Sequence, residues 1–473
     1  MKEITDMNVD FAKWYTDVVR KSGLADYSPI KGCMYIGPYG TALWENIRNE
    51  LDSRFKALGH ENVMLPLLIS ESMLQKEKDH IAGFAPEVAW VTHGGEEKLT
   101  ERLCIRPTSE VLFCDFFQKQ IQSWRDLPLK YNQWCNIVRW EKATRPFLRT
   151  TEFFWQEGHT LHETEEEARA HTIRMWENYA DFAKNVLAMP VAVGRKTNLE
   201  KFAGAVETYT IEPLMHDGQA LQAGTSHYLG TGFAKAYGIT FADRSGKIAH
   251  PHQTSWGVST RLIGGIIMSH GDNNGLVLPP RIAPVQVVVI PVQMQKDGVL
   301  KATEKLAKSI EKIARVKVDK GDQTPGWKFS EWEMKGVPLR IEYGPRDIEN
   351  KTCVIARRDT GEKQTLLVAD LKKQISLILD QIQNGIYEKA LKRNEGMLHE
   401  AKTFDEMKEL AKTKKGFIKA PWCGSDACEQ RIKKEIGLTS RCIPSETFGQ
   451  KIEVNSICCS SAAKHIVLWG RAY

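Results

Sequence analysis

The sequence predicts a multidomain α+β protein, in which a large first domain that contains an antiparallel hairpin is followed by an α/β module and a last segment from about residue 394. The chain has 473 residues, which is too long for one hydrophobic core. Two strand-like runs, residues 131–140 and 153–159, flank a short basic loop, as in an antiparallel hairpin. After residue 285, strand and helix patterns alternate over roughly 100 residues, which is typical of an α/β module.

Several periodic segments precede the α/β module. Residues 40–58 carry apolar side chains at helical spacing and end at Gly59, which is suited to a helix C-cap. Residues 63–69 read as a strand, and their internal Pro66 places that strand at a sheet edge or an interface. Residues 110–121 form a helix pattern. Thr164 and Glu167 predict a capping box for a helix that runs to about residue 186. Residues 253–260 resemble a strand and residues 261–268 a glycine-rich helix.

A proline-rich stretch, residues 275–284, predicts a domain boundary. The β-branched run 285–292 then reads as a buried strand. A helix (300–314), three strands (315–319, 338–343 and 352–357) and a long helix (369–393) follow. We therefore expect domains at residues 1–284, 285–390 and 391–473.

Composition is that of an ordinary globular protein, and it excludes some classes of function. The longest apolar run, residues 262–268, is far shorter than the roughly 20 residues of a membrane-spanning helix. The first residues lack an apolar secretory core, and the ten cysteines are scattered, so a reducing cytoplasm is expected. Lys and Arg number 31 against 34 Asp and Glu in residues 1–285, and 34 against 25 in residues 286–473. The basic second half favours a polyanionic partner, although a solvated mixed surface is an equally simple interpretation.

The hairpin at residues 139–160 carries the main candidate site. If Arg139 and Glu141 alternate across Trp140 on one strand, both side chains leave the same face. Arginine is always charged and presents a planar fork of donors suited to phosphate or carboxylate. A surface ion pair would have the same pattern. Arg145, Arg149 and Thr150 in the loop, with Trp155 and Glu157 on the returning strand, favour an anion site.

Other segments fit the same site or have plainer explanations. Arg261 opens a helix, where the helix dipole disfavours a cation unless an anion lies nearby; otherwise Ser259 or Thr260 caps a helix whose arginine faces solvent. Thr108 and Ser109 could simply cap the helix that begins at Glu110. The remaining segments are a polar turn, residues 222–227, and an apolar loop, residues 84–90, that is either packed or a lid.

Cysteines near the end of the chain raise the question of a metal. Cys423 and Cys428 are spaced C-x4-C, and Cys458 and Cys459 follow about thirty residues later. Tetrahedral zinc favours two short-spaced thiolate pairs. Adjacent cysteines make a poor second pair, because neighbouring side chains on an extended segment point apart.

Taken together, these residues resemble class II aminoacyl-tRNA synthetases, and specifically the prolyl-tRNA synthetases of the archaeal and eukaryotic-like type. The resemblance covers essentially the whole chain, and it implies an antiparallel-sheet catalytic domain, an α/β anticodon-binding domain and a small α/β C-terminal domain. Gly59–Pro66 is similar to the dimer-interface motif, Arg139-x-Glu141 to the second class motif, and residues 255–261 to the third. More selective are R-P-T-S-E at 106–110, F-L-R-T-T-E at 147–152, W-Q-E-G-H at 155–159, K-F-A-G-A at 201–205 and T-S-H at 225–227.

The resemblance implies a role for each matching residue. Arg139 and Arg261 would be catalytic, with Arg139 between the ATP α-phosphate and the proline carboxylate and Arg261 at the γ-phosphate. ATP contacts would also come from Glu141, Arg149, Thr150, Gln222, Thr225 and Ser259. The proline pocket would contain Thr108, Glu110, Arg139, Trp155, Glu157, Phe202, His227 and Trp256. Phe84 and Glu87 would belong to a lid.

The same resemblance implies cofactors and partners. ATP would act with Mg²⁺ in a cytoplasmic homodimer that joins L-proline to tRNA(Pro), read by an anticodon-binding domain at 285–390. Cys423 and Cys428 match the first zinc pair of the family's C-terminal domain, but Ser456 takes the first position of the second pair. Cys458 would substitute by a local shift beside Cys459. Only 121 residues separate Arg139 from Arg261, which leaves no room for an editing insertion, so alanine would be mischarged.

Rival functions remain within this resemblance. A threonyl or seryl enzyme is disfavoured by the absence of Cys and His zinc ligands in the pocket and by its aromatic walls. A tRNA-binding or regulatory paralogue commonly loses one of the two ATP arginines, and both are present here. The sequence identifies no general base for transfer to tRNA.

Overall fold

The computed structural model describes residues 4–76 and 88–473. Its main feature is an 11-stranded sheet with strand order β20-β21-β23-β22-β9-β10-β11-β14-β8-β7-β3. The strands at its centre are β7 (Leu129–Val138), β8 (Glu152–His162), β14 (His252–Ser259), β11 (Gly224–Gly230), β10 (Glu207–Pro213) and β9 (Val191–Arg195), and they pair antiparallel with one another, whereas β3 at the edge pairs parallel with β7. The prediction of an antiparallel sheet that contains the hairpin of β7 and β8 is therefore confirmed.

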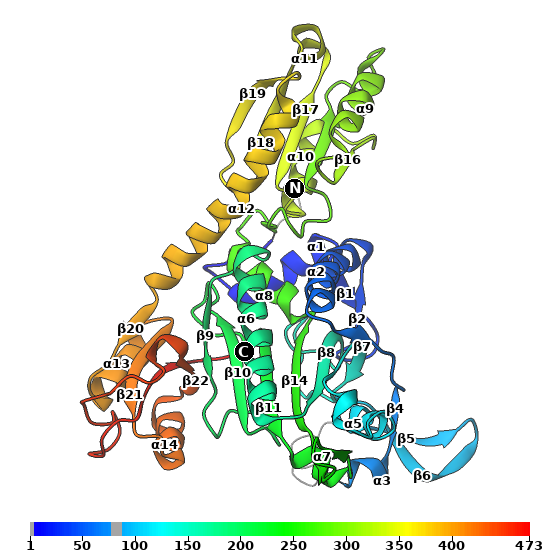
Figure 1. Ribbon diagram of the computed structural model, residues 1–473. Helices are drawn as coiled ribbons and strands as arrows, with labels where there is room; N and C mark the ends of the chain where they lie inside the picture. Colours follow the sequence, from blue (N-terminus) through cyan, green and yellow to red (C-terminus); the bar gives the residue numbers. More distant parts are fainter. Residues whose placement is uncertain (1–3, 77–87) are drawn as a thin grey trace.

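One face of the central sheet is covered by α6 (Glu165–Asn185), with α2 (Pro38–Ala57) and α8 (Arg261–His270) beside it (Figure 1). Thr164 Oγ accepts from the backbone N–H of Glu167 at 3.2 Å, as its sequence spacing predicts. The buried residues of α6 repeat at helical spacing, among them Met175, Trp176, Tyr179 and Ala183. The main hydrophobic core lies between these helices and the sheet.

The strand predicted at residues 63–69 is wrong in most of its length. The structure has β3 at Glu61–Asn62 and β4 at Leu68–Ser70, with no regular element between them. Pro66 has no N–H for a strand ladder, and side chains satisfy the neighbouring backbone instead. The Arg106 guanidinium donates to the carbonyl oxygens of Leu65 and Pro66, and Leu65 N–H donates to Gln133.

A five-stranded sheet, β16-β15-β17-β18-β19, forms a separate body at the top of Figure 1. It comprises β15 (Val287–Pro291), β16 (Val316–Val318), β17 (Leu339–Tyr343), β18 (Thr352–Arg357) and β19 (Lys363–Leu367), with α9 (Val299–Ile310), α10 (Pro325–Met334), α11 (Pro345–Asn350) and α12 (Leu371–Glu395). The strands and helices predicted after residue 285 are present. Sequence reasoning left out α10, α11 and β19.

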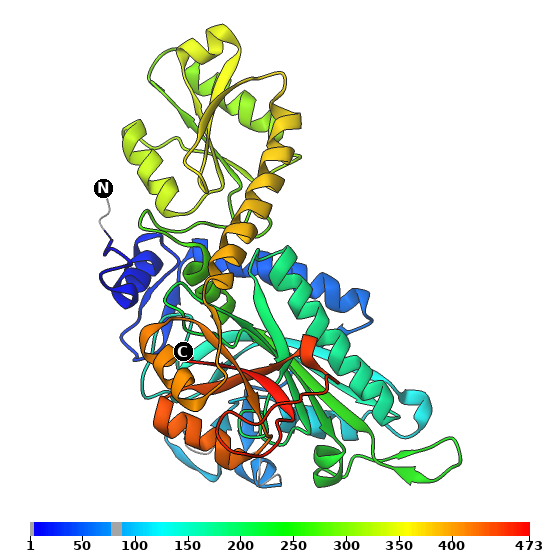
Figure 2. The ribbon, with the colours of Figure 1, turned by 90° about the vertical axis from the view of Figure 1, so that its left-hand side faces the viewer.

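Helix α12 leads from this body to the C-terminal elements, which extend the central sheet instead of forming a sheet of their own (Figures 1 and 2). They are β20 (Leu398–Glu400), α13 (Phe404–Thr413), β21 (Phe417–Trp422), α14 (Asp426–Ile436), β22 (Thr439–Pro444) and β23 (His465–Gly470). Strand β22 pairs antiparallel with β9, with Ile443 opposite Arg195.

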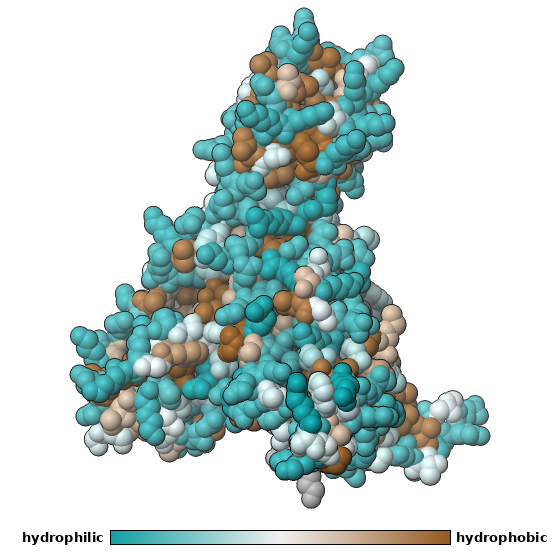
Figure 3. Space-filling view, in the orientation of Figure 1, coloured by the Kyte–Doolittle hydropathy of each residue, from teal (hydrophilic) through white to brown (hydrophobic). Residues whose placement is uncertain are grey.

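The remaining α-helices and strands that the structure describes precede β14 in the chain. They are α1 (Phe11–Lys21), β1 (Ala25–Tyr27), β2 (Met34–Ile36), α3 (Glu71–Leu74), β5 (Ala89–Gly94), β6 (Glu97–Ile105), α5 (Glu110–Gln118), α7 (Gly232–Ala236), β12 (Phe241–Ala242) and β13 (Ile248–Ala249). The surface in Figure 3 is largely hydrophilic, with small scattered hydrophobic groups. None of the helices within residues 4–76 and 88–473 is long and apolar enough to cross a membrane.

Candidate active site

A cavity of about 210 Å³ lies on the face of the central sheet opposite α6. Twelve of the residues expected from the sequence line it: Thr108, Glu110, Arg139, Trp155, Glu157, Phe202, Gln222, Thr225, His227, Trp256, Ser259 and Arg261. They come from segments as distant as residues 108 and 261, so the fold brings the separate sequence candidates into one site.

Arg139 lies just beyond the end of β7 at Val138, so it and Glu141 are not on a strand as the alternation argument assumed. Its Nε donates to the carbonyl oxygen of Pro107 at 3.0 Å. Its guanidinium carbon is 5.4 Å from the Trp155 ring centre and 5.6 Å from that of Phe153. The backbone carbonyl of Pro107 and the two aromatic rings therefore hold the Arg139 side chain at the cavity wall.

Arg261 begins α8, the helix expected at this place. Its Nε donates to Leu148 O at 3.0 Å, and its Nη1 donates to Gln222 O at 3.2 Å. Burial, followed by the charges of Arg139 and Arg149, lowers the pKa of Arg261 to about 10. Three arginines close together leave positive charge for an anion to neutralise, which argues against the plain capping explanation.

The loop between β7 and β8 holds three other expected ATP contacts, and none of them lines the cavity. Arg149 forms an ion pair with Glu141 at 2.8 Å, and about half of its side chain is exposed. Thr150 is buried. Glu141 is held by Arg149 and not by a hydrogen bond from the strand.

Glu157 is a buried, hydrogen-bonded carboxylate in the cavity. Its oxygens accept from Ser109 N–H at 3.0 Å and from the Gln133 side chain at 3.1 Å, and His159 Nε2 lies 3.3 Å away. Burial alone would raise the pKa of Glu157, but the hydrogen bonds and charge of His159 and the donors of Ser109 hold it below the ordinary value. Ser109 therefore orients this carboxylate, and its side chain does not cap α5.

The expected small-substrate end of the cavity is lined by hydroxyls, one carboxyl and two rings. The Thr108 hydroxyl donates to Glu110. The hydroxyls of Thr208 and Thr225 lie at 2.9 and 3.0 Å from the two ring nitrogens of His227, whose ring is 4.7 Å from Phe202. Burial, followed by the charge of His159, lowers the pKa of His227 to about 3, so the imidazole is neutral.

The expectation that the Trp256 ring forms a pocket wall has to be corrected. Trp256 pairs with Gly158 across β8 and β14, and its ring lies on the α6 side, 4.8 Å from the rings of both Phe55 and His60. Side chains alternate along a strand, so the neighbours of Trp256, Ser255 and Gly257, face the cavity.

Some lining residues were not assigned to the site from the sequence: Phe153, His159, Glu200, Lys201, Thr208 and Ser255. Phe153 and His159 share the face of β8 that carries Trp155 and Glu157, so the alternation of the strand was the signal that could have found them. Thr208 pairs with His227 across β10 and β11, which no sequence pattern reveals. Phe84 and Glu87, the expected lid, lie outside the described residues.

Comparison with known families and proteins adds to this geometry. Residues 90–270 match the tRNA synthetase class II core domain (G, H, P, S and T), and residues 286–377 match an anticodon binding domain. Residues 404–473 match the C-terminal part of prolyl-tRNA synthetases. A proline–tRNA ligase 2 of Bacillus cereus is 57% identical over all of this chain and 99% of its own length. The chain belongs to the prolyl-tRNA synthetase family.

Other relatives agree with this membership. A proline–tRNA ligase of Clostridium novyi is 59% identical, over all of this chain and 98% of its own. The crystal structure of a prolyl-tRNA synthetase from Cryptosporidium parvum, complexed with halofuginone and AMPPNP, aligns with a TM-score of 0.93, 42% identity and 99% coverage of both chains. The predicted family and class II fold are thereby confirmed.

The C-terminus of this family member returns to the active-site cavity. Ala220 N–H donates to Arg471 O at 2.8 Å, and Tyr473 N–H donates to Ala220 O at 3.2 Å. Ala220 lies two residues before Gln222, which lines the cavity. The Tyr473 hydroxyl donates to Asp217, and Arg145 lies 5.4 Å above its ring. The last residue therefore contacts the arginine loop between β7 and β8.

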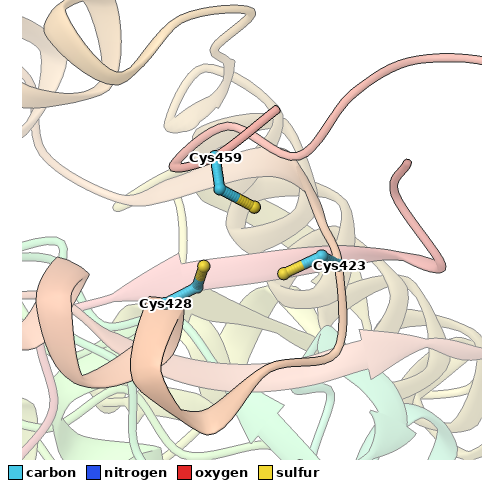
Figure 4. A group of neighbouring side chains, drawn as sticks. All are labelled: Cys423, Cys428 and Cys459. Carbon is cyan, nitrogen blue, oxygen red and sulfur yellow. The ribbon is translucent and has the colours of Figure 1, made fainter. Parts of the chain in front are cut away.

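Three cysteine sulfurs, those of Cys423, Cys428 and Cys459, lie within 4.8 Å of one another (Figure 4). Cys458 also neighbours the Cys428 thiol. Hydrogen bonds from Ser461 and Ser456 lower the pKa of Cys459 to about 6, which favours the thiolate form. A set of soft thiolates at this spacing fits zinc. Because Ser456 stands where the family has the first cysteine of the second ligand pair, that pair is represented here by Cys459 with Cys458 beside it.

Proposed function

We propose that this protein is a proline–tRNA ligase that uses ATP and Mg²⁺ to join L-proline to tRNA(Pro) through a prolyl-adenylate. The observation that carries the proposal is the single cavity that holds Arg139 and Arg261 together with the Glu157 network. Family membership over the whole chain supports it.

The two steps need mainly orientation and charge neutralisation. The proline carboxylate attacks the α-phosphorus and pyrophosphate leaves; the terminal ribose hydroxyl of tRNA then attacks the adenylate carbonyl and AMP leaves. Both reactants of the first step are anions at their reacting ends, so Arg139 beside Trp155 and Arg261 at the start of α8 would lower the barrier by binding developing charge. Mg²⁺ bound with ATP would share the phosphate charge.

Proline is a secondary ammonium with two N–H donors and a small apolar ring. Thr108, Glu110 and Glu157 offer acceptors, and the rings of Phe202 and Trp155 offer apolar walls. Gln222, Thr225 and Ser259 would contact ATP, and Glu141, Arg149 and Thr150 would do so after the loop closes on the nucleotide. Ser255 Oγ is buried without a hydrogen-bond partner among residues 4–76 and 88–473, so a ligand atom could satisfy it.

Proline-dependent ATP–pyrophosphate exchange tests this assignment. Arg139→Ala is expected to lower kcat/KM at least about 100-fold, since it removes charge stabilisation of about 2.7 kcal/mol or more. Arg346→Ala, on exposed α11, is the matched control and should retain full exchange. Unchanged exchange by the Arg139 variant would remove this residue from the mechanism.

Selectivity against alanine would be limited. An apolar pocket loses only about 1–3 kcal/mol of binding free energy for each missing methylene, and the chain between Arg139 and Arg261 contains no editing insertion. We therefore infer that alanine is mischarged, at a rate measurable as alanyl-tRNA after prolonged incubation. Absence of that product would contradict the inference.

The domain division and assembly are proposed on similar grounds. Residues 1–284 would hold catalysis, residues 285–390 the anticodon, and residues 391–473 a zinc-supported C-terminal domain. A homodimer through the Gly59–Pro66 segment is supported by a groove of about 410 Å³ whose lining includes Trp44, Leu65, Trp134, Met64 and Phe154. Met64 is 97% exposed in the single chain and adjoins the other apolar side chains of this groove, and a contiguous apolar patch of this kind is typical of an interface.

A further inference from the structure

A second cavity, of about 200 Å³, lies at the joint between the catalytic strands and the C-terminal elements. One wall is formed by residues 195–207, and the other by Trp422, Gly424, Ile443 and His465. Pairing of β22 with β9 holds the two walls together. A Cβ at Gly194 would lie 2.1 Å from Ile443 O, so the close approach of these strands requires glycine there.

The walls of this cavity, which we call the joint cavity, carry unbalanced positive charge. Lys196 Nζ lies 2.6 Å from Glu212, and Arg441 lies 3.0 Å from the same carboxylate. All three side chains are at most 6% exposed. Two buried cations thus share one buried carboxylate, and a surplus charge of this kind is costly unless an anion compensates it.

The more exposed part of the wall has arginines that are closer to balance, and two further lysines lie nearby. Arg195 and Arg169 share Glu207, at 3.3 and 2.7 Å. Lys201 lines the joint cavity, and the Lys464 side chain packs beside Gly424. Burial, followed by the charges of Arg195 and Lys464, lowers the pKa of His465, as expected in a positive environment.

Acidic groups near the joint cavity do not cancel this charge. Glu429 lies behind Thr197, and one of its oxygens accepts from the hydroxyls of Thr197 and Ser440. Glu165 is the second ion-pair partner of Arg169, so Arg169 and Arg195 are matched by two carboxylates, and the surplus charge comes from Lys196 with Arg441 and from the two lysines. The side chains that line the cavity itself include only one carboxylate, Glu207.

Lys201 lines both this cavity and the active-site cavity. The two spaces are therefore neighbours, separated by the loop that carries Lys201. Phe448, which is 42% exposed, lies beside Arg195 with the guanidinium carbon 6.0 Å from its ring centre. An exposed ring next to phosphate-binding cations is the combination used to hold single-stranded nucleic acid.

We propose that the joint cavity binds the phosphodiester backbone of the single-stranded 3′ end of tRNA as that end enters the active site. This inference rests on the proposed function, because it requires tRNA to be the second substrate. Arg195, Lys201 and Lys464 bind phosphate oxygens, and Phe448 stacks on a base. Arg195 and Lys464 are positioning residues, since neither touches the reacting atoms.

The test compares Arg195→Gln/Lys464→Gln with wild type in two assays. Proline-dependent ATP–pyrophosphate exchange, which needs no tRNA, is expected to stay within about twofold. The KM for tRNA in aminoacylation is expected to rise about tenfold, and the slope of log KM against log salt is expected to fall by about 0.7 for each lost contact. Lys434→Gln, exposed on α14, is the control and should change neither assay.

A second arm locates the contact on the RNA. Neutral methylphosphonate linkages placed in the last three nucleotides of tRNA should raise KM about fivefold for wild type and little for the double variant, because the charge they remove has already lost its partner. Lys464→Gln alone, at an exposed position, keeps the test valid if the double variant does not fold.

The outcomes separate the two proposals. Failure of wild type to exchange pyrophosphate with proline would overturn the proposed function. Normal exchange with an unchanged KM for tRNA in the variants, or equal methylphosphonate effects in both enzymes, would overturn the joint-cavity assignment. Loss of inorganic phosphate binding in the double variant without any change in KM for tRNA would assign the cavity to a free anion and would also overturn it.

Discussion

The indole ring of Trp256 lies so close to Gly158 that a Cβ on Gly158 would be 2.1 Å from ring atom Cζ2. The ring cannot move away easily, because Phe55 and His60 pack against it. Gly158 follows Glu157 directly on β8, so this contact sets the position of the strand that carries the hydrogen-bonded carboxylate of Glu157.

Gly158→Ala should therefore destabilise the protein by about 1–3 kcal/mol and raise the KM for proline, because strand β8 must shift to admit the methyl group. Thermal unfolding and pyrophosphate exchange measure the two effects. Gly232→Ala, where a Cβ would meet nothing within 4 Å, is the control. An alanine variant at 158 with unchanged melting temperature and KM would show that the ring adapts.

Removal of Tyr473 should lower kcat/KM for ATP in exchange by about tenfold, or about 1.4 kcal/mol. The tyrosine anchors the arginine loop through Arg145 and bonds to Asp217, so its loss should loosen Arg149 and Glu141. Tyr473→Phe keeps the ring and should have a smaller effect. Equal activity of all three proteins would contradict a role for the tail at the site.

Purified protein should contain about one zinc ion per chain, bound through Cys423, Cys428 and Cys459 with Cys458 or water as the fourth ligand. Cys428→Ala should remove the metal and lower the melting temperature of the C-terminal elements, whereas Cys33→Ala should retain it. Elemental analysis decides the content. A zinc-free sample with an unchanged melting temperature would rule out a structural metal here.

Acid should destabilise the protein through three buried histidines beneath the sheet. His60 Nδ1 donates to Phe55 O, and His60 Nε2 lies 3.1 Å from His171 Nε2, while His162 packs on the other side of His171. Burial lowers the pKa values of His60, His162 and His171 to about 4, 3 and 2, and the charge of Lys130 acts in the same direction.

These folded-state values lie below the ordinary 6.5, so the unfolded chain binds the additional protons. Above pH 6.5 the contribution of each histidine to the free energy of unfolding does not change. As the pH drops below 6.5, this contribution decreases by up to about 1.4 kcal/mol per pH unit, until the folded-state pKa is reached. His171→Asn should flatten the dependence of melting temperature on pH between 6.5 and 4, and exposed His93→Asn should not. Parallel curves for wild type and His171→Asn would contradict this origin of acid sensitivity.

The sequence predicted well those features that depend on local pattern. The Thr164 cap, the periodic α2 and α6, and the hairpin of β7 and β8 follow from side-chain spacing alone. The prediction failed where side chains that are distant in the sequence decide the local backbone structure. The 63–69 strand is broken because Arg106 and Gln133 satisfy its backbone. The omission of α10 has another origin, because its start carries local signals, the cap Thr324 and Pro325, that could have been recognised.

At the site, the sequence predicted which residues are present but not the direction in which every side chain points. The Trp256 ring faces α6 because its register places it opposite Gly158, a pairing that one sequence does not reveal. The C-terminal extension of the central sheet, and with it the joint cavity, likewise depends on the pairing of β22 with β9, in which Ile443 lies opposite Arg195, 248 positions earlier in the chain.

The identity of the amino acid activated at the Arg139 cavity tests the central claim most directly. Pyrophosphate exchange should be measured with proline, threonine, serine and alanine under the same conditions. Proline should give the highest kcat/KM, alanine a low but measurable one, and threonine and serine none above background. Exchange that depends on threonine or serine and not on proline would contradict the account.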